Sequence, residues 1–346
     1  MPFSRRAPSA RDGGARTPQA YSGAVREQLA DLQRARVIGA TFDVAAQRGA
    51  GSVTVAHVVE RSGVSRRTFY EHFEDREDCL LAAFERALTL VSQHVVPAYD
   101  AQKGWRERIR AGLVELLCFC DREPSVARML VCESQASGPR VTKRRAHVLS
   151  KLTLIVDQGR TLTGTDREGK AQNISPLVAE GIVGGVLAVI QARVLEEGQK
   201  PLIGLTNELT SMIVLPYLGP ARARRQLDRP LPASASARRG EDALISDPFK
   251  DSGMRLTYRT VRVLMAIAQH PQASNRQIGE TAGITDQGQI SKLLARLERI
   301  GLARNTGIHP GKGAPNSWTL AEKGQRIAEN IRANTEGSQS HGAHER

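Results

Sequence analysis

The sequence predicts an all-helical protein that is followed by a small domain of mixed helix and strand. Apolar residues recur at helical spacing from Gln28 to Leu218, and stretches rich in Gly and Pro divide this region into separate helices. A second patterned region begins at Leu256, and it contains three helical stretches and then two β-like runs. With 346 residues the chain is long enough for two or three domains, each with its own core.

The positions of the breaks divide the chain into six expected segments. The first residues are rich in Arg, Ala, Pro and Gly, and the stretch from Gly219 to Arg255 also lacks an apolar stripe. We therefore expect a disordered basic arm at 1–27, a first helical domain at 28–92, a second helical domain at 93–218, a flexible linker at 219–255, a mixed domain at 256–333 and a disordered tail at 334–346.

The chain is strongly basic, with 49 Lys and Arg residues against 36 Asp and Glu residues and a formal net charge of +13. A positive charge of this size favours polyanionic partners such as nucleic acid. The excess is greatest in residues 256–333, which hold eleven basic and five acidic residues, whereas residues 29–88 are nearly neutral. The net charge by itself therefore does not locate a binding site.

A pair of short helices is expected around residues 54–73. Thr54 can cap a first helix that ends at Ser62, and Gly63 then permits a tight turn. Ser65 can cap a second helix that continues to Phe73. This order of helix, turn and helix is the arrangement in which a second helix enters the major groove of DNA. The sequence therefore predicts a helix-turn-helix.

The second of these helices has an inward and an outward face. Phe69 and Phe73 are four residues apart and can pack inward together. Arg66, Arg67 and Tyr70 are then left on other faces. Arginine can donate two hydrogen bonds to guanine, while hydroxyl groups and helix N-termini suit phosphates. The pattern predicts that this helix reads double-stranded DNA.

At these residues the segment resembles the TetR (tetracycline-repressor) family of bacterial transcription regulators. The matching residues are Gly63, Val64, Ser65, Thr68, Phe69, Tyr70, His72, Phe73 and Arg76. The resemblance implies that Arg66 and Arg67 read bases. It also implies a set that faces phosphates or braces the motif, which comprises Thr54, Ser65, Thr68, Tyr70 and His72. The sequence departs from the usual pattern at Val59, Ser62 and Cys79, and at Arg76 the expected basic residue is arginine where the family usually has lysine. These departures affect only local packing.

The same resemblance carries expectations for the second helical domain. It implies a homodimer held through helices at 174–199 and 201–218, and an unknown small-molecule effector within the helical core. Gly181, Gly184 and Gly185 could allow the close approach of a partner helix. The expected function is that of a ligand-responsive repressor on a pseudo-palindromic DNA site.

The mixed domain contains a second candidate DNA-binding surface on the helix expected from Asp286 to about Ile300. Its inward stripe consists of Ile290, Leu293, Leu294, Leu297 and Ile300. This stripe places Gln289, Lys292, Arg296 and Arg299 on one outward face, with Gln287 and Ser291 beside it. Two β-like runs, 302–306 and 317–320, then bracket a Gly- and Pro-rich loop, as in a hairpin with a flexible tip.

Three helices and a basic hairpin describe a winged helix, and the runs 293–302 and 320–324 resemble the MarR group of regulators. The expected DNA-binding residues are Gln287, Gln289, Ser291, Lys292, Arg296, Arg304 and Lys312, with His309 as a further hairpin contact. The sequence lacks the acidic-basic pair at the wing tip. Because winged helices also serve as protein-binding modules, a protein partner stays open as the alternative.

No catalytic, cofactor or metal site is predicted. The sequence contains no Gly-rich phosphate loop, nucleophile elbow or paired carboxylates, so we do not expect an enzyme. The histidines His57, His72, His94 and His147 are scattered rather than spaced as metal ligands.

The expected location is the cytoplasm. The four cysteines, Cys79, Cys118, Cys120 and Cys132, form no CxxC pair and lie in apolar surroundings, which is typical of a reducing compartment. No apolar run reaches the roughly 18 residues that a membrane-spanning helix needs. Residues 1–23 lack the apolar centre of a secretory signal.

Overall fold

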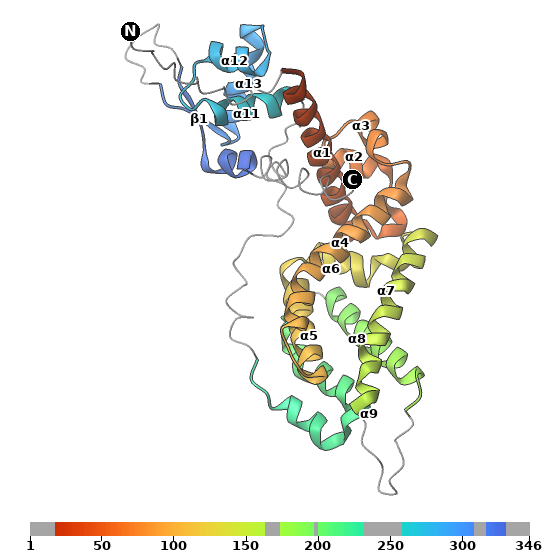
Figure 1. Ribbon diagram of the computed structural model, residues 1–346. Helices are drawn as coiled ribbons and strands as arrows, with labels where there is room; N and C mark the ends of the chain where they lie inside the picture. Colours follow the sequence, from red (N-terminus) through yellow and green to blue (C-terminus); the bar gives the residue numbers. More distant parts are fainter. Residues whose placement is uncertain (1–17, 163–173, 197–199, 232–257, 308–315, 330–346) are drawn as a thin grey trace, which may run out of the picture. The chain divides into compact units, whose positions relative to one another are not determined.

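A computed structural model describes residues 18–162, 174–196, 200–231, 258–307 and 316–329 (Figure 1). These residues fall into two compact units. One unit is Arg34–Lys250, and the other combines Met1–Gln33 with Asp251–Arg346. The described residues of the first unit are helical throughout, and the only strands among the described residues belong to the second unit.

The N-terminal helical region is built from α1 (Pro18–Arg48), α2 (Val55–Ser62), α3 (Arg66–His72) and α4 (Arg76–Asp100). The helix α1 begins at Pro18, so the expectation of a disordered arm up to residue 27 is wrong for residues 18–27. A proline suits the first position of a helix because its fixed φ is helical and no intrahelical bond is lost there. The residues that follow include Gln, Ala, Arg and Glu, which are good helix formers.

The core of this region collects apolar residues from all four helices. Its largest buried side chains include Phe42, Phe69, Phe73, Leu80 and Phe84, each at most 2 % exposed. The inward packing expected for Phe69 and Phe73 is therefore confirmed, and their ring centroids lie 5.4 Å apart. This shared core holds the helix-turn-helix rigidly against α1 and α4.

The helix α4 contains a proline in its last turn. Pro97 lies inside the helix, which continues to Asp100, and the Ala101 N–H donates to the Pro97 carbonyl at 3.0 Å. A proline within a helix removes one backbone hydrogen bond, and in the last turn this loss is local. With 25 residues α4 is about 37 Å long, since a helix rises 1.5 Å per residue.

The second helical domain contains α5 (Trp105–Arg122), α6 (Pro124–Val131), α7 (Pro139–Asp157), α8 (Leu177–Leu195) and α9 (Thr206–Leu227). Three short 3-10 turns accompany them, η2 (Glu133–Gln135), η3 (Gln158–Leu162) and η4 (Leu202–Leu205), while η1 (Ala50–Ser52) lies between α1 and α2. Pro124 and Pro139 each open a helix, as the predicted breaks at these prolines require. Trp105, Leu117, Ile190 and Tyr217 are among the residues buried in the core.

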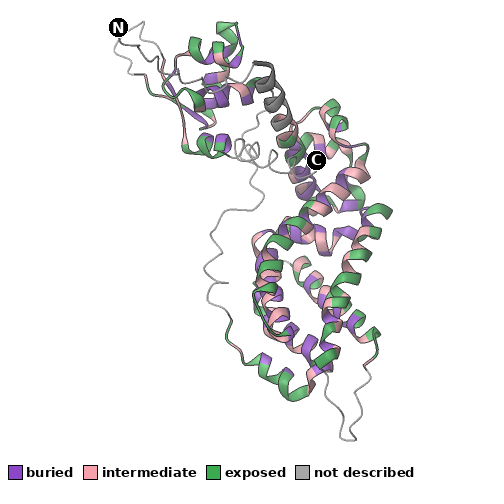
Figure 2. Cartoon of the chain, viewed as in Figure 1, coloured by how far each residue is buried: buried purple, intermediate pink, exposed green. Residues whose placement is uncertain are grey.

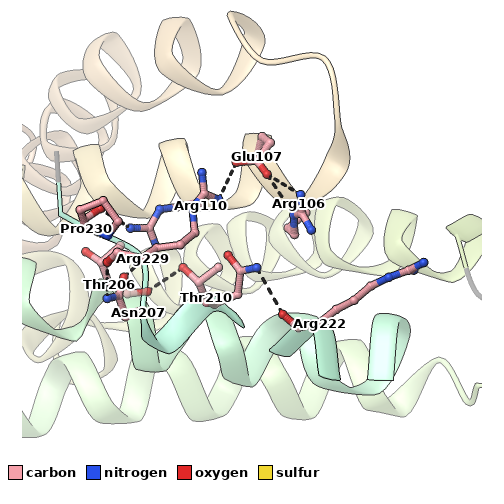
Figure 3. Close-up of polar contacts among 10 residues, drawn as sticks. Arg106, Glu107, Arg110, Thr206, Asn207, Thr210, Arg222, Arg229 and Pro230 are labelled. Carbon is pink, nitrogen blue, oxygen red and sulfur yellow. Dashed lines mark hydrogen bonds and ion pairs between the residues drawn. The ribbon is translucent and has the colours of Figure 1, made fainter. Parts of the chain in front are cut away.

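The chain after Gly219 does not leave the core as a linker. Gly219 has a φ of 78° and kinks α9, which then continues to Leu227. Residues 228–231 follow, and the Arg229 guanidinium pairs with Glu107 of α5 at 2.7 Å. Arg110, also on α5, donates to the Pro230 carbonyl at 3.1 Å (Figure 3). The expected linker at 219–255 is therefore wrong for residues 219–231, because charged and amide side chains dock this stretch onto α5.

The second unit contains α11 (Tyr258–Gln269), α12 (Asn275–Ala282), α13 (Gln287–Arg299), β1 (Ala303–Asn305) and β2 (Trp318–Leu320), followed by a helix at 322–329. The strands β1 and β2 pair antiparallel, with Arg304 opposite Thr319. A Cβ on Gly324 would overlap the Leu302 carbonyl oxygen, so the last helix packs close to β1 only because residue 324 is glycine. The three predicted helices and the predicted hairpin strands are confirmed, while the hairpin tip at 308–315 lies outside the described residues.

In the part of the chain that the structure describes, two helices, α4 and α8, are long and apolar enough to cross a membrane by length and composition alone. The sequence expectation that no segment qualifies is therefore wrong for these two. Core helices pass the same test, and both α4 and α8 contribute buried residues to the cores (Figure 2). Each of these helices also has exposed residues.

Candidate nucleic-acid interface

The helix-turn-helix is fixed by two side-chain caps and one glycine. The Thr54 hydroxyl accepts a hydrogen bond from the His57 N–H at 3.2 Å, and the Ser65 hydroxyl accepts from the Thr68 N–H at 3.0 Å. Gly63 ends α2 with a φ of 66°, a left-handed conformation that favours glycine. Each cap uses a backbone N–H that the helix itself leaves unpaired. The turn predicted from these three residues is confirmed.

The outward face of α3 carries the residues that are expected to read DNA. Arg66, Arg67 and Tyr70 are exposed, and Tyr70 keeps 53 % of its surface in solvent. Phe69 between them is fully buried. The burial of Phe69 fixes the rotation of α3, so the two arginines and Tyr70 must point away from the core.

Two interactions on α3 order the exposed side chains before any DNA is bound. The Arg67 guanidinium pairs with the Glu71 carboxylate at 3.0 Å, and the hydroxyls of Ser65 and Thr68 lie 2.8 Å apart. The Arg67 side chain is 89 % exposed, so this ion pair contributes little to stability but limits the rotamers of Arg67. A phosphate or guanine would compete with Glu71 for the same guanidinium.

The remaining predicted residues of this motif are less exposed. Thr68 and His72 are half-buried, and the His72 ring lies 6.4 Å from the Phe73 ring. Thr54 is exposed at the start of α2. Thr54 and Ser65 are thus positioned at helix N-termini, where backbone N–H groups and hydroxyls together suit a phosphate.

Sequence reasoning did not anticipate how the helix-turn-helix region is attached to the second helical domain. The Glu133 carboxylate of η2 accepts from the Ala50 N–H at 2.7 Å and from Arg128 at 3.1 Å. The Ala50 carbonyl in turn accepts from Arg76, at the start of α4, at 2.5 Å. Glu133 is only 8 % exposed, and nothing in its local sequence distinguishes it from a surface glutamate.

The exposed face of α13 agrees with its predicted orientation. Ile290, Leu294 and Leu297 are buried. The exposed residues are Gln287, Gln289, Ser291, Lys292, Arg296 and Arg299. Arg304 on β1 is exposed as well, whereas Lys312 and His309 lie outside the described residues. The basic and amide side chains of α13 therefore form one continuous surface.

A polar network crosses this surface from α12. The Asn275 amide donates to the Ser291 hydroxyl at 2.9 Å, and its carbonyl oxygen accepts from the Trp318 indole N–H at 2.6 Å. Gln289 accepts a hydrogen bond from Arg259 of α11 at 2.8 Å. Two predicted base readers, Gln289 and Ser291, thus already have protein partners. Asn275 was missed because an asparagine at a helix N-terminus reads from sequence only as a capping residue.

The start of α13 is negatively charged. The Asp286 carboxylate accepts from the Gln289 N–H at 3.1 Å and from the Gly288 N–H at 2.8 Å. These backbone hydrogen bonds, with a further contribution from Lys292, lower the pKa of Asp286. Asp286 therefore stays ionised at the N-terminus of α13, the helix that would approach DNA. Its carboxylate orients α13 and does not bind phosphate.

A cavity of about 360 Å³ lies within the second helical domain, between α4, α5, α7, α8 and α9. Sixteen residues line it, and only Tyr99 and Asp100 among them have polar side chains. Both belong to the last turn of α4, whose first turn begins next to α3. One helix therefore connects the cavity wall with the candidate DNA-binding region. Across the described residues no group of three His, Cys, Asp or Glu side chains is placed to hold a metal ion.

The comparison with protein families identifies the first of these surfaces. Residues 37–83 match the model of the bacterial regulatory proteins of the tetR family. This range contains α2, α3 and both caps. The chain therefore carries the N-terminal DNA-binding domain of the tetR family.

Curated relatives match about a third of the chain. The nucleoid occlusion factor SlmA of Vibrio vulnificus is 26 % identical over 128 residues, which cover 36 % of this chain and 63 % of SlmA. The HTH-type transcriptional activator FasR of Mycolicibacterium smegmatis is 23 % identical over 111 residues, which cover 32 % of this chain and 51 % of FasR. The chain thus spans less than two thirds of the length of either relative.

Solved structures similar to this chain include the fatty acid degradation regulator FadR from Bacillus halodurans. It is 16 % identical, covers 53 % of this chain and 94 % of FadR, and has a TM-score of 0.45. FadR from Bacillus subtilis, solved in complex with stearoyl-CoA, is 17 % identical over 52 % of this chain and 96 % of that chain, with a TM-score of 0.44. The matched family model describes bacterial regulatory proteins, and FasR is a transcriptional activator.

Proposed function

We propose that this protein is a ligand-responsive transcriptional repressor that binds double-stranded DNA through α3. The observation that carries the proposal is the pair of exposed arginines, Arg66 and Arg67, at the start of a helix whose rotation is fixed by buried Phe69. Such a helix presents its first turns to base edges in the major groove. Because its DNA would be chromosomal, we propose a cytoplasmic location.

We further propose that the protein acts as a homodimer through α8 and α9. One side of α8 is exposed at Leu177, Gly181, Gly184, Ala188 and Leu195. A Cβ on Gly181 or Gly184 would have no neighbour within 4 Å, which leaves room for a second helix to approach closely. Leu215 of α9 is 47 % exposed. A largely apolar face of this kind supports burial against a second copy of the same face.

The cavity supports a role for a small-molecule effector. Its volume of about 360 Å³ lies in the range of small-molecule sites, and its walls are apolar. Val95, Val96, Tyr99 and Asp100 of α4 line it. An occupant that moves the last turns of α4 would also move its first turn, which Arg76 links to the backbone between α1 and α2. Ligand binding would thereby change how well α3 fits DNA.

For the C-terminal unit we propose a second DNA-binding surface of winged-helix type on α13 and the β-hairpin. The support is the exposed row of Lys292, Arg296 and Arg299, with Arg304 on the neighbouring strand. A protein partner is the competing interpretation, since a basic surface also suits an acidic protein. Two linked DNA-binding units would raise each other's effective concentration on one DNA molecule.

The proposal is tested by fluorescence anisotropy of the full chain with a duplex from the region upstream of its own gene. We expect binding that survives a large excess of random duplex. If the protein bound the upstream duplex no more tightly than the random competitor, the proposal of sequence-specific binding would be overturned. An increase in the expression of a reporter gene on addition of ligand would then distinguish a repressor from an activator.

A further inference from the structure

The cavity allows the chemical class of its occupant to be inferred, and this inference rests on the effector role proposed above. Among the sixteen described residues that line the cavity, none is Lys, Arg or His. The two polar side chains, Tyr99 and Asp100, are adjacent and occupy one end of α4. Val96 and Leu152, also in the lining, are 51 % and 37 % exposed, so the cavity opens to solvent beside them.

A cation beside this polar end, Arg108, is held by other groups. The Arg108 guanidinium lies 5.3 Å from the centroid of the Tyr99 ring, and its Nε donates to the Gln102 carbonyl at 2.8 Å. Arg108 is not part of the cavity lining. The Tyr99 hydroxyl donates to Gln158 Oε1 at 3.4 Å, which leaves Asp100, an exposed residue at the edge of the cavity, as the single charged residue in the described lining.

An anionic ligand fits these walls poorly. Its carboxylate or phosphate would lose water against apolar side chains and would meet the like charge of Asp100. A hydrogen-bond donor at the same point would instead have the Asp100 carboxylate as its acceptor. We propose that the cavity binds an apolar molecule with one donor group, an ammonium or a hydroxyl, that faces Asp100, and that it excludes anionic amphiphiles.

The proposal is tested with three probes that share one alkyl chain: decylamine, decanol and decanoate. Each is titrated into the full chain below its aggregation concentration, with calorimetry and thermal unfolding as readouts. Decylamine and decanol should bind and raise the melting temperature, and decylamine should bind roughly tenfold more tightly than decanoate. Binding of decanoate as tight as that of decylamine, or no binding of decylamine and decanol, would overturn the proposal.

Three variants test which residues determine the affinities of the probes. Asp100→Asn should remove the advantage of decylamine over decanol while decanol still binds. Gly112→Leu should prevent binding of all three probes, because a Cβ at this lining position already lies 3.6 Å from Tyr99 and Val95. Arg108→Gln should leave the order of affinities unchanged. If Arg108→Gln abolished tight decanoate binding, Arg108 would be an anion site and the proposal would be wrong.

DNA binding is measured on the same preparation without ligand. Specific DNA binding together with a preference for decanoate would overturn only the ligand class. A preference for donor probes without specific DNA binding would overturn only the proposed regulatory function.

Discussion

The Glu133 carboxylate accepts a 2.7 Å hydrogen bond from the Ala50 N–H, and this buried contact joins η2 to the turn between α1 and α2. Gly49, the neighbour of Ala50, has a φ of 76°, so the backbone turns sharply at this point. The contact couples the second helical domain to the helix-turn-helix through backbone atoms. Because the donor is a backbone N–H, the partner that a substitution can remove is the Glu133 carboxylate.

Glu133→Ala should lower the free energy of unfolding by about 1–3 kcal/mol, because the buried Ala50 N–H would lose its acceptor. The matched variant Glu133→Gln keeps one acceptor oxygen and should lose less. Urea denaturation followed by circular dichroism measures both. Equal stability of Glu133→Ala and the wild type would mean that the contact does not contribute.

Replacing Arg66 and Arg67 with Ala should weaken specific DNA binding by about 1–3 kcal/mol for each bidentate arginine–base pairing that is removed. Arg86→Ala, on the exposed side of α4, is the control for a loss of positive charge. Anisotropy titrations on one duplex measure all three proteins. If the Arg86 variant lost as much affinity as the double variant, general electrostatics rather than α3 would explain the binding.

Gly184→Leu should convert a dimer into a monomer without changing the helical content. A Cβ at residue 184 has no neighbour within 4 Å among the described residues, and the leucine side chain would occupy the space that a second helix needs. Light scattering at micromolar concentration gives the mass, and circular dichroism gives the helicity. A dimeric Gly184→Leu protein would place the interface elsewhere.

Deleting residues 256–346 should leave a folded protein that still binds its specific site, because 219–231 remain docked on α5. Affinity for long DNA should fall, and the slope of log affinity against log salt should become shallower by roughly 0.9 for each phosphate that the protein no longer neutralises. Lys292→Ala with Arg296→Ala should change the slope in the same direction. Equal slopes for truncated and full-length protein would favour a protein partner for the C-terminal unit.

The cysteines should react slowly with alkylating reagents at pH 8. Burial raises the pKa of Cys79 and Cys120 to about 12 and that of Cys132 to about 11, so the reactive thiolate is scarce. Half-buried Cys132 should be modified before the fully buried Cys79 and Cys120. Raising the pH toward 11 should speed its modification, and unfolding the protein should expose all four thiols. Mass spectrometry after timed alkylation measures the order, and rapid labelling of Cys120 in the folded protein would contradict it.

Sequence reasoning succeeded where local chemistry decides the structure. The caps Thr54 and Ser65, the turn at Gly63 and the inward stripe of α13 each depend on residues within a few positions, and all are found. It failed where the structure of a segment depends on residues far away in the sequence. Residues 219–231 look like a linker until Glu107 and Arg110, more than a hundred positions earlier, dock them on α5.

In the candidate DNA-binding site, too, local features could be predicted from the sequence and contacts between distant residues could not. The outward face of α3 followed from the spacing of Phe69 and Phe73, whereas the partners of Gln289 and Ser291 come from Arg259 and Asn275 on other helices. Such contacts carry no periodic signal in the sequence.

The most direct test of the account is selection of DNA by the purified full chain from a random duplex library, followed by sequencing. We expect a pseudo-palindromic motif, and we expect Arg66→Ala with Arg67→Ala to lose preference at the corresponding bases in both halves. Enrichment of no motif, or an unchanged motif with the double variant, would contradict the claim that α3 reads DNA.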